Sequence, residues 1–494
     1  MLLNEIARLP GVISSARVSP VQILGIAYDS RRVEPGFLFV AIRGEKTDGN
    51  QYVRQAFESG AVAVAAEPPV QDQSGFPYLQ VQDARAFLAL ASRSFCGNPA
   101  AHLQLAGITG TNGKTTSSFL LFSIFRSAGI RACLVGTLGM RIGDEPFPSA
   151  HTTPESSDLA SFLARALREG CTHGAAEVSS HALVLKRVFG TKFRTGIFTN
   201  LTPEHLDFHH DMDSYYRAKR LLFVPEGGND LESAVINWDD PFGKRLRAEI
   251  GVPSLTFGFE SDADIRVLDW EARIDGTNLR LTTPAGELAI RARLSGRPHV
   301  YNIMAATGAA LNMGFGLETI RQGIENLEGV PGRMQRVAAG QPYTVIVDYA
   351  HTPDALETLL ETIRRLPHRK LITVFGCGGD RDRKKRPVMG QIAGRLSDFV
   401  IVTSDNPRTE DPRSILAEIE PGLRESSSPY QLQPDRRQAI GTALSMARDG
   451  DAVVIAGKGH EKYQQIGDRV LPFDDVEVAR ATLTRRRKRS SGAG

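Results

Sequence analysis

The segment GITGTNGKTT, at residues 107–116, restricts the possible folds of this chain more than any other. It closes the apolar run AHLQLAGIT and opens the run SSFLLFSIF, which predicts a buried strand, a glycine-rich turn and a helix. In that arrangement, backbone N–H groups and the helix N-terminus point at phosphate oxygens. Lys114 can reach the terminal phosphates of a nucleotide, and the Thr115 hydroxyl can bind Mg²⁺. The segment therefore predicts a nucleotide-binding α/β domain.

The glycine spacing of this segment departs from the common phosphate loop. The pattern GxxxxGK[ST] requires a glycine five residues before Gly113, where Ile108 stands. Gly107, Gly110 and Gly113 recur instead at three-residue steps. A glycine-rich turn that only caps a helix is the alternative, but these glycines before Lys-Thr-Thr favour a phosphate site. The expected nucleotide contacts of the loop are Gly110, Thr111, Asn112, Gly113, Lys114, Thr115 and Thr116.

The whole chain has 494 residues, which is too long for one core and predicts three domains. Its 41% hydrophobic and 23% charged residues are typical of a soluble globular protein, and a net charge of +3 indicates no particular partner. The start, MLLNEIARLPGVISS, lacks the uninterrupted apolar core of a signal peptide. The 4 cysteines form no CxxC pair and are expected to be reduced. We expect a cytoplasmic monomer without membrane or nucleic-acid partners, whose basic run at 485–489 is a solvated tail.

The domain boundaries are predicted from breaks in the strand and helix patterns. Residues 1–98 are expected to form a small α/β domain, with strand-like runs FLFVAIRG and AVAVAAE. Residues 99–331 alternate strands with helical patterns and end in three alternating stretches typical of an antiparallel insertion. Residues 332–494 form the third domain.

Four apolar strands of the third domain each run directly into a polar cluster. They are YTVIVDYAHTPDA, KLITVFGCGGDRD, DFVIVTSDNPRTEDP and DAVVIAGKGHEK. Because crossover helices bring the carboxyl ends of parallel strands to one edge, these clusters are expected to form one site. The GCGGD turn could instead bind a dinucleotide, but Arg381 stands where GxGxxG needs its last glycine.

The motifs together resemble the Mur ligase family. GITGTNGKTT, EVSSHAL, FTNLTPEHLDFH, YYRAKRLLF, VPGRMQRV, DYAHTPDAL, GCGGDRD, DNPR and GKGHE occur in order over nearly the whole chain. The phosphate loop is of the GxxGxxGK[ST] kind found in this family. The resemblance implies an α/β fold with a small N-terminal domain, a central mostly parallel P-loop ATPase domain and a C-terminal Rossmann-like domain.

The resemblance also implies a reaction in peptidoglycan precursor synthesis. ATP would convert the D-Glu γ-carboxylate of UDP-MurNAc-L-Ala-D-Glu into an acyl phosphate, and an amine of meso-diaminopimelate would attack it. These steps join anions or build up negative charge, so the site needs cations. By resemblance Lys114, Lys219 and His205 are catalytic, and Lys219 is carbamylated. Mg²⁺ would be held by Thr115, Glu177, His205 and the Lys219 carbamate.

The substrate contacts are likewise carried over by resemblance. Asn302, Arg333 and Asp348 would contact ATP, whereas His351 and Asp354 contact it or only cap a turn or helix. A glutamine of some relatives is replaced here by Leu185. The expected contacts of the UDP-muramoyl dipeptide are Ser30, Arg31, Thr152, Thr153, Ser179 and Arg187.

The DNPR motif decides the expected amino acid. In the family it marks enzymes that use meso-diaminopimelate, whose far carboxylate suits a bidentate guanidinium such as that of Arg408. A lysine side chain ends in an ammonium, which Arg408 would repel. Glu461 would meet the far ammonium of diaminopimelate. The expected contacts are Arg381, Asp405, Asn406, Pro407, Arg408, Gly457 and Glu461.

Three alternatives remain open at this stage. The same chemistry could use L-lysine, which an amino-acid competition assay distinguishes. A folylpolyglutamate synthetase belongs to the same wider superfamily, but a folate enzyme gives no reason for DNPR. A P-loop switch or nucleic-acid motor that uses the basic tail would hydrolyse ATP in response to nucleic acid.

Overall fold

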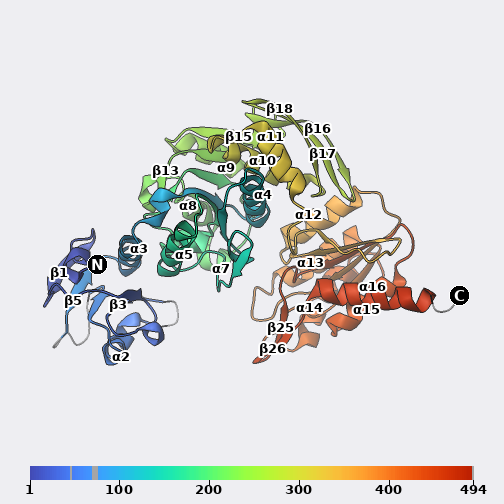
Figure 1. Ribbon diagram of the computed structural model, residues 1–494. Coiled ribbons are helices and arrows are strands. Elements are labelled where there is room, and N and C mark those ends of the chain that lie inside the picture. Colours follow the sequence, from blue (N-terminus) through green and yellow to red (C-terminus); the bar gives the residue numbers. More distant parts are fainter. Residues whose placement is uncertain (45–46, 69–75, 492–494) are drawn as a thin grey trace.

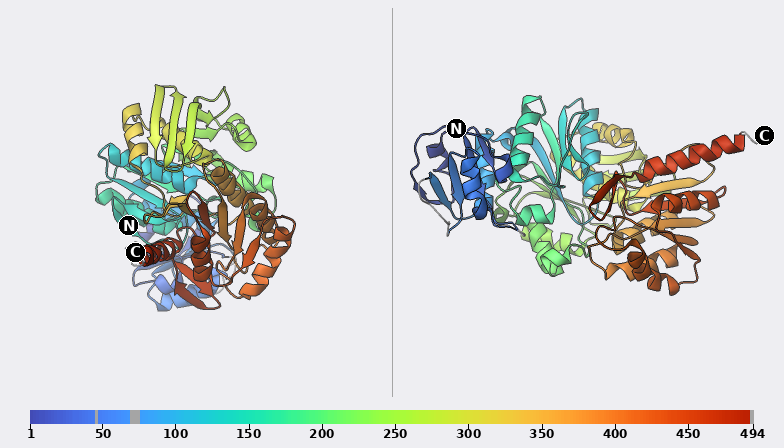
Figure 2. Two further views of the ribbon diagram at one scale, coloured as in Figure 1. Left: turned by 90° about the vertical axis from the view of Figure 1, so that its right-hand side faces the viewer. Right: turned by 90° about the horizontal axis from the view of Figure 1, so that it is seen from below.

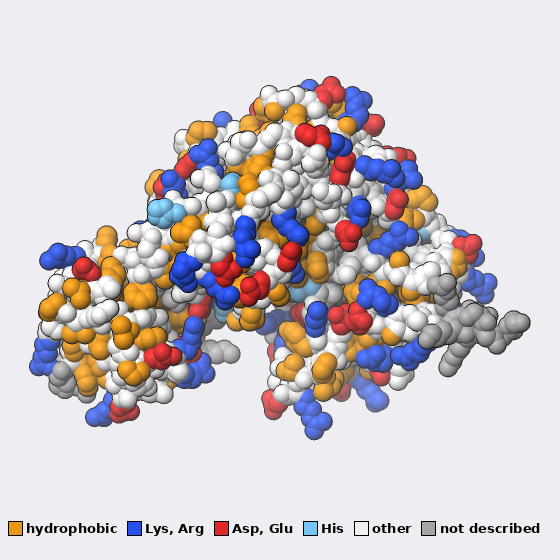
Figure 3. Space-filling view, viewed as in Figure 1, with side chains coloured by type: hydrophobic (Ala, Val, Ile, Leu, Met, Phe, Trp, Pro, Cys, Tyr) orange, Lys and Arg blue, Asp and Glu red, His pale blue; other side chains and the backbone are white. Residues whose placement is uncertain are grey.

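The computed structural model describes residues 1–44, 47–68 and 76–491. Three sheets, each with its own helices, follow one another along the chain and lie in a row (Figures 1 and 2). In the space-filling view the molecule is notched between its N-terminal and C-terminal parts, beneath the central part (Figure 3). The three-part α/β architecture expected from the sequence is confirmed.

The N-terminal part is a five-stranded sheet of order β1-β5-β4-β3-β2. Its apolar strands β3 and β4 are parallel and fully buried over most of their length, as the continuous apolar runs predicted. The strands are β1 Val12–Ala16, β2 Gly25–Ala27, β3 Phe37–Ala41, β4 Ala63–Ala66 and β5 Tyr78–Val81. The helices are α1 Leu3–Ile6, α2 Val53–Glu58 and α3 Ala84–Phe95.

The central part is built on an 11-stranded sheet of order β18-β17-β16-β15-β14-β12-β6-β10-β7-β8-β9. The phosphate-loop strand β6 lies between β12 and β10 and is parallel to both. The strands are β6 Gln104–Thr109, β7 Ala132–Gly136, β8 Gly139–Ile142, β9 Glu145–Phe147, β10 His173–Glu177, β12 Thr195–Phe198, β14 Ala234–Asn237, β15 Ser254–Gly258, β16 Ile265–Arg273, β17 Gly276–Thr283 and β18 Gly286–Ala292. A separate pair is formed by β11 Lys192–Phe193 and β13 Asp230–Leu231. The last three strands pair antiparallel, so the predicted insertion is confirmed.

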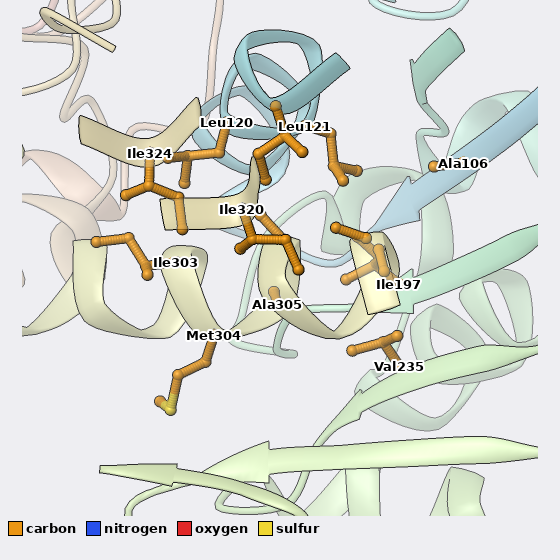
Figure 4. Close-up of a cluster of buried hydrophobic side chains, with 14 of the residues drawn as sticks. Ala106, Leu120, Leu121, Ile197, Val235, Ile303, Met304, Ala305, Ile320 and Ile324 are labelled. Carbon is orange, nitrogen blue, oxygen red and sulfur yellow. The ribbon is translucent and has the colours of Figure 1, made fainter. Parts of the chain in front are cut away.

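Helices cover both faces of the central sheet. The helix that follows the phosphate loop, α4, packs with α10 and α11 over β6, β12 and β14 through buried aliphatic side chains (Figure 4). Ile108 stands in β6 inside this core, where it is 0% exposed. The helices are α4 Lys114–Ser127, α5 Ser156–Arg168, α6 Ser180–Val184, α7 Leu206–His209, α8 Met212–Arg220, α9 Pro241–Glu249, α10 Arg297–Asn312 and α11 Leu317–Asn326. This packing holds the loop between two rigid elements.

The C-terminal part has a six-stranded sheet of order β19-β20-β24-β21-β22-β23. The four strands predicted from apolar runs are the parallel β20, β24, β21 and β22, so their polar ends meet at one edge. The strands are β19 Gln335–Arg336, β20 Thr344–Asp348, β21 Leu371–Phe375, β22 Phe399–Val402, β23 Tyr430–Leu432 and β24 Ala452–Ala456. The hairpin β25 Tyr463–Ile466 and β26 Arg469–Pro472 stands apart from this sheet. The helices are α12 Pro353–Arg364, α13 Lys385–Leu396, α14 Pro412–Arg424, α15 Arg436–Met446 and α16 Asp475–Ser491.

The central and C-terminal parts touch each other beside the nucleotide region. Ala272 and Ile274, where β16 turns into β17, pack against the core of the C-terminal part, and β16 and β17 reach toward α12 in Figure 1.

Helix α16 continues through the basic run, of which the side chains of residues 487–489 lie outside those described. Among the residues that the structure describes, no helix has both the length and the apolar character needed to cross a membrane.

Candidate active site

A cavity of about 600 Å³ lies between the central and C-terminal parts. The central part contributes the phosphate loop, and the C-terminal part contributes the end of β20 and the first turns of α12. Lys114, Arg333 and His351 all line it, although they are far apart in the sequence. A ligand in this cavity would therefore contact both parts at once.

The phosphate loop has the backbone that its glycines predicted. Gly113 adopts φ +89°, which side chains rarely tolerate, and a Cβ there would overlap the Oδ1 atom of Asn302 on α10. The Lys114 ammonium donates to the carbonyl oxygens of Gly110 (2.9 Å) and Thr111 (2.8 Å). Two backbone carbonyls of the loop therefore bind the ammonium of Lys114, and the Asn302 side chain lies next to Gly113.

Lys219 brings a second ammonium to the same carbonyl. Its Nζ donates to the Gly110 oxygen at 2.8 Å, and the residue is 1% exposed. Burial, and then the neighbouring Lys114, lower the pKa of Lys219 well below its ordinary value. Burial also lowers the pKa of Lys114. Because two adjacent buried cations are unfavourable, Lys219 is biased toward the neutral amine, which is the form that reacts with electrophiles.

Glu177 is a buried carboxylate at the end of β10, next to the loop. Its Oε2 accepts from the Thr115 hydroxyl (3.0 Å) and the Thr137 hydroxyl (2.9 Å), and its Oε1 accepts from the Thr137 N–H (2.9 Å). Hydroxyl and carboxylate oxygens are donors that Mg²⁺ prefers, with phosphate oxygens and water completing its shell. Thr115 and Glu177 therefore fit a Mg²⁺ ion, whereas Lys219 fits one only as a carbamate. No cluster of three or more His, Cys, Asp or Glu ligands occurs within the described residues.

His205 and Glu204 also line the cavity. His205 adopts φ +56° and its side chain is 46% exposed, with Nε2 at 3.8 Å from Glu204. Glu204 also lies 4.0 Å from Nε2 of His351, which comes from the C-terminal part. Burial lowers the pKa of both imidazoles. Glu204 is thus a carboxylate between two histidines of different domains.

Arg333 and Asp348 join the C-terminal part to the phosphate loop. Arg333 donates to the Thr115 hydroxyl at 3.4 Å, and its guanidinium lies 4.9 Å from the ring centre of Tyr349. Asp348 accepts from the backbone N–H groups of Met334 (2.6 Å) and Ala350 (2.8 Å). Burial raises the pKa of Asp348. Asp348 therefore fixes the backbone on which Arg333 and Tyr349 stand.

Asp354 makes the most direct contact between the two parts. Its Oδ2 accepts from Nδ2 of Asn112 in the phosphate loop (3.0 Å) and from the Thr202 hydroxyl (3.1 Å). The N-cap of α12 is Thr352, whose hydroxyl accepts from the Ala355 N–H. Asp354 is therefore not needed as a cap, and its side chain is used across the domain boundary.

The residues expected to face the muramoyl peptide lie beside Glu177. Thr152 is 3.2 Å from the Thr137 hydroxyl, Thr153 donates to the Glu177 carbonyl (2.9 Å), and Arg187 donates to the Thr153 carbonyl (3.1 Å). Ser179 accepts from the Ala182 N–H and so caps α6. These four residues are brought together.

Ser30 and Arg31 stand at the junction of the N-terminal and central parts. The flanking residues Tyr28 and Arg32 both bond to Asp158 in the first turn of α5, at 3.3 and 2.8 Å. Ser30 is buried and bonded to Gln55, whereas the Arg31 side chain is 82% exposed and paired with Asp29. The segment is thus anchored close to Thr153 and Glu155, with Arg31 free to reach solvent.

The polar ends of the C-terminal strands form a second cluster. Gly378 lies against two arginine side chains, because a Cβ there would lie 3.0 Å from Nη1 of Arg408 and 3.8 Å from Cγ of Arg381. Burial and the nearby Glu461 raise the pKa of Tyr463, whereas the charges of Arg408 and Arg381 act on it in the opposite direction. Asp405 adjoins Gly457, since a Cβ on Gly457 would be 2.7 Å from its Oδ2. Pro407 is buried next to Gly379.

Tyr349 connects this cluster to the cavity. The centre of its ring lies 4.9 Å from the Arg333 guanidinium and 4.7 Å from the centre of the His460 ring. Burial and the nearby Glu461 raise the pKa of Tyr349 to about 12. The nucleotide region and the arginine cluster are therefore neighbouring parts of one surface.

Family models match most of the chain in three segments. The Mur ligase middle domain matches residues 108–310, the glutamate ligase domain of Mur ligases matches 332–459, and the Mur ligase family catalytic domain matches 22–95. The chain belongs to the Mur ligase family. It is an ATP-dependent ligase, and the membership predicted from its motifs is confirmed.

Similar Mur ligases extend over the full length of the chain. One from Solibacter usitatus is 45% identical over 98% of both chains, and one from Geobacter metallireducens is 42% identical over 100% of both. Each is named UDP-N-acetylmuramoyl-L-alanyl-D-glutamate--2,6-diaminopimelate ligase. A solved structure with the same name has a TM-score of 0.72 and 35% identity, covering 99% of each chain. A folylpolyglutamate synthase of Mycobacterium tuberculosis, 18% identical with a TM-score of 0.62, shares the fold.

Several residues of this Mur ligase site were not predicted from the sequence. Thr137 and Glu204 are ordinary polar residues near strand or turn ends, and no spacing distinguishes them. The sequence does not decide whether Asp354 is a cap or a contact. Lys458 lies inside the GKGHE motif, so its position beside the expected amino-acid contacts could have been noticed.

Proposed function

We propose that this Mur ligase joins an amine of meso-diaminopimelate to the D-Glu γ-carboxylate of UDP-MurNAc-L-Ala-D-Glu, with conversion of ATP to ADP and phosphate. The full-length relatives that carry this name support the proposal. The observation that carries the choice of amino acid is that the side chains of Arg381 and Arg408 both lie next to Gly378, with Nη1 of Arg408 the nearest atom.

The cations of the cavity suit the two chemical steps. In the first, a carboxylate oxygen attacks the γ-phosphorus of ATP and ADP leaves, which gives an acyl phosphate. In the second, the amine attacks the acyl carbon and phosphate leaves. Lys114 and Arg333 stand beside the phosphate loop, where they can stabilise the charge on the transferred phosphoryl group. Lys114 must exchange its two carbonyl partners for phosphate oxygens when ATP binds.

Thr115 and Glu177 would hold Mg²⁺, with His205 as a further ligand. When bound, Mg²⁺ neutralises phosphate charge and draws the phosphoryl group and the carboxylate into register. Thr137 keeps Glu177 oriented toward Thr115.

Lys219 is proposed to act as a carbamate. Burial next to Lys114 favours its neutral amine, which can add to CO₂ and become an anion. The resulting negative charge would pair with Lys114, so the modification replaces a repulsion by an attraction. It would also supply oxygen atoms on the side of the loop where the Gly110 carbonyl now accepts hydrogen bonds from Lys114 and Lys219.

We assign residues 1–98 to the UDP end of the substrate, 99–331 to ATP and Mg²⁺, and 332–494 to the amino acid. The contacts with ATP would come from residues 110–116 with Asn302, Arg333 and Asp348. The contacts with the dipeptide substrate would come from Ser30, Arg31, Thr152, Thr153, Ser179 and Arg187. We propose a cytoplasmic monomer, since ATP is its co-substrate, and expect no nucleic-acid or membrane partner.

The test is ADP release from the full chain with UDP-MurNAc-L-Ala-D-Glu, Mg²⁺ and ATP, comparing meso-diaminopimelate with L-lysine. We expect turnover with diaminopimelate and at most slow turnover with lysine, because Arg408 meets an ammonium there. Equal rates with both amino acids would refute the assignment of Arg381 and Arg408. ATP hydrolysis that requires nucleic acid instead of the dipeptide substrate would favour the motor alternative.

A further inference from the structure

Lys458 is a fully buried lysine in the C-terminal part that the proposed mechanism does not use. It is 0% exposed and follows Gly457, which comes directly after the apolar strand β24. Its ammonium donates to the Glu461 carboxylate at 2.9 Å and to the Asn406 amide oxygen at 3.1 Å. A buried ammonium is retained in a fold only where such partners compensate for the lost water. Its partners are two of the residues expected to contact the amino acid.

Asn406 is oriented by this lysine. Its amide oxygen accepts from Lys458 and from the Gln465 N–H at 3.0 Å, and its amide nitrogen donates to Glu461 at 2.8 Å. The residue is 2% exposed. With the oxygen held by two donors, the amide can face Glu461 only with its nitrogen. Asn406 therefore directs one of its two amide N–H groups at the Glu461 carboxylate.

Glu461 is left with one available oxygen. Both hydrogen bonds, from Lys458 and from Asn406, end on its Oε2 atom. Within the part of the chain that the structure describes, Oε1 accepts no hydrogen bond, and the side chain is 18% exposed. The carboxylate is thus held at one oxygen and open at the other, near Arg408 and Tyr463. Such a group suits a single ammonium.

We infer that Lys458 is a positioning residue that holds the Glu461 carboxylate for the far ammonium of a diamino acid. The inference rests on the proposed function. Arg381 and Arg408 would bind the far carboxylate, and Glu461 would bind the ammonium on the same carbon. Lys458 neutralises the excess negative charge of Glu461 and, through Asn406, sets its orientation. The amino-acid preference then depends on a side chain that does not touch the substrate.

The experiment uses steady-state kinetics of the full chain with Lys458→Met, which keeps the stem and removes the ammonium. Lys462→Met is the matched control, because Lys462 is exposed in the same loop. Loss of a charge-assisted bond predicts a rise of roughly tenfold or more in the KM for meso-diaminopimelate. The KM for ATP should stay within about twofold of its original value, and Lys462→Met should change neither.

A substrate analogue without the far amine distinguishes a positioning role of Lys458 from general damage to the fold. The analogue 2-aminopimelate has both carboxylates but lacks the far amine, so it makes no contact with Glu461. Its KM should be the same for the unchanged protein and for Lys458→Met. If Lys458→Met folds poorly, Lys458→Gln provides the same comparison with a side chain that can still donate to Asn406.

The double variant with Glu461→Gln identifies the path of the effect. We expect Lys458→Met to add little to the KM rise already caused by Glu461→Gln. Additive losses, an unchanged KM for diaminopimelate in Lys458→Met, or an equal rise for 2-aminopimelate would overturn the inference. If Glu461→Gln alone leaves the KM for diaminopimelate unchanged, the contact of Glu461 with the far ammonium, expected from the sequence, fails instead.

Discussion

Replacing Asp354 by alanine should weaken the closed arrangement of the central and C-terminal parts. The substitution removes both cross-domain hydrogen bonds of its Oδ2, from Asn112 at 3.0 Å and from Thr202 at 3.1 Å. Asn112 belongs to the phosphate loop, so the contact transmits the position of α12 directly to the nucleotide site. Because ATP is expected to contact both parts, closure must precede chemistry.

The size of the effect can be worked out from the two bonds. Burial raises the pKa of Asp354, because desolvation disfavours the charged carboxylate and so offsets the attraction that its charge would add. Counted as ordinary hydrogen bonds of about 0.5–1.5 kcal/mol each, the pair contributes about 1–3 kcal/mol. This corresponds to a roughly five- to 150-fold change in the ratio of closed to open protein. Asparagine retains a neutral oxygen that both donors can reach, so Asp354→Asn should lose less than about threefold.

The assay is kcat/KM for ATP, measured from ADP release with the other substrates saturating. Small-angle scattering with a non-hydrolysable ATP analogue gives an independent measure, since Asp354→Ala should remain more extended at a given concentration. Asp449→Ala, an exposed acid in the same part of the chain, is the control. The reasoning fails if Asp354→Ala behaves like the control, or if Asn and Ala substitutions cause equal losses.

Four further outcomes follow from the site and its surroundings. Arg408→Lys keeps the charge but loses the planar fork, so the KM for diaminopimelate should rise roughly tenfold or more while that for ATP is unchanged; equal kinetics would exclude carboxylate binding there. Gly113→Ala forces a side chain into φ +89° and against Asn302, so ATP affinity measured by calorimetry should fall roughly tenfold, and an unchanged affinity would contradict the proposed role of this loop. Lys219→Ala should be nearly inactive with or without bicarbonate but should still bind ADP, and full activity would refute its role. Paired guanidinium groups lower the pKa of Glu410 from 4.5 to about 2, so the stabilisation by its carboxylate is present above pH 4.5 and is lost as the pH falls through about 2. At pH 7 the free energy of unfolding of Glu410→Gln, from urea titration, should be lower than that of the original protein by about 1–2 kcal/mol after solvent screening. This difference should shrink toward zero at pH 2.

The sequence predicted those parts of the site that depend on strand ends. Buried parallel strands such as β20 and β22 are continuous apolar runs, and their ends must meet at one edge, so DYAHTPDA and DNPR could be placed together from the sequence alone. The phosphate loop was predictable for the same reason, since its glycines and Lys114 are adjacent in the chain.

The contacts that depend on three-dimensional distance could not be predicted. Lys458 follows a strand and Asp354 stands in the first turn of α12, and at both places a solvated side chain is the usual outcome. The role of Lys458 depends on its burial, and the role of Asp354 depends on the contact between the C-terminal and central parts. Neither feature produces a periodic pattern in the sequence. Strand β23 was missed because Tyr430–Leu432 has only 3 residues, too few to show alternation.

The first residue of α16 has a consequence for altering the end of the chain. Asp475 is 0% exposed and receives two hydrogen bonds from the guanidinium of Arg436, which also donates to the carbonyls of Ser404 and Ala456, just ahead of Asp405 and Gly457. The final helix therefore supports the backbone beneath residues that are expected to bind the amino acid. A fluorescent reporter or affinity tag attached beyond residue 491 should be tolerated. A truncation that removes Asp475 would leave the buried guanidinium of Arg436 without its carboxylate partner beneath those residues and should inactivate the enzyme.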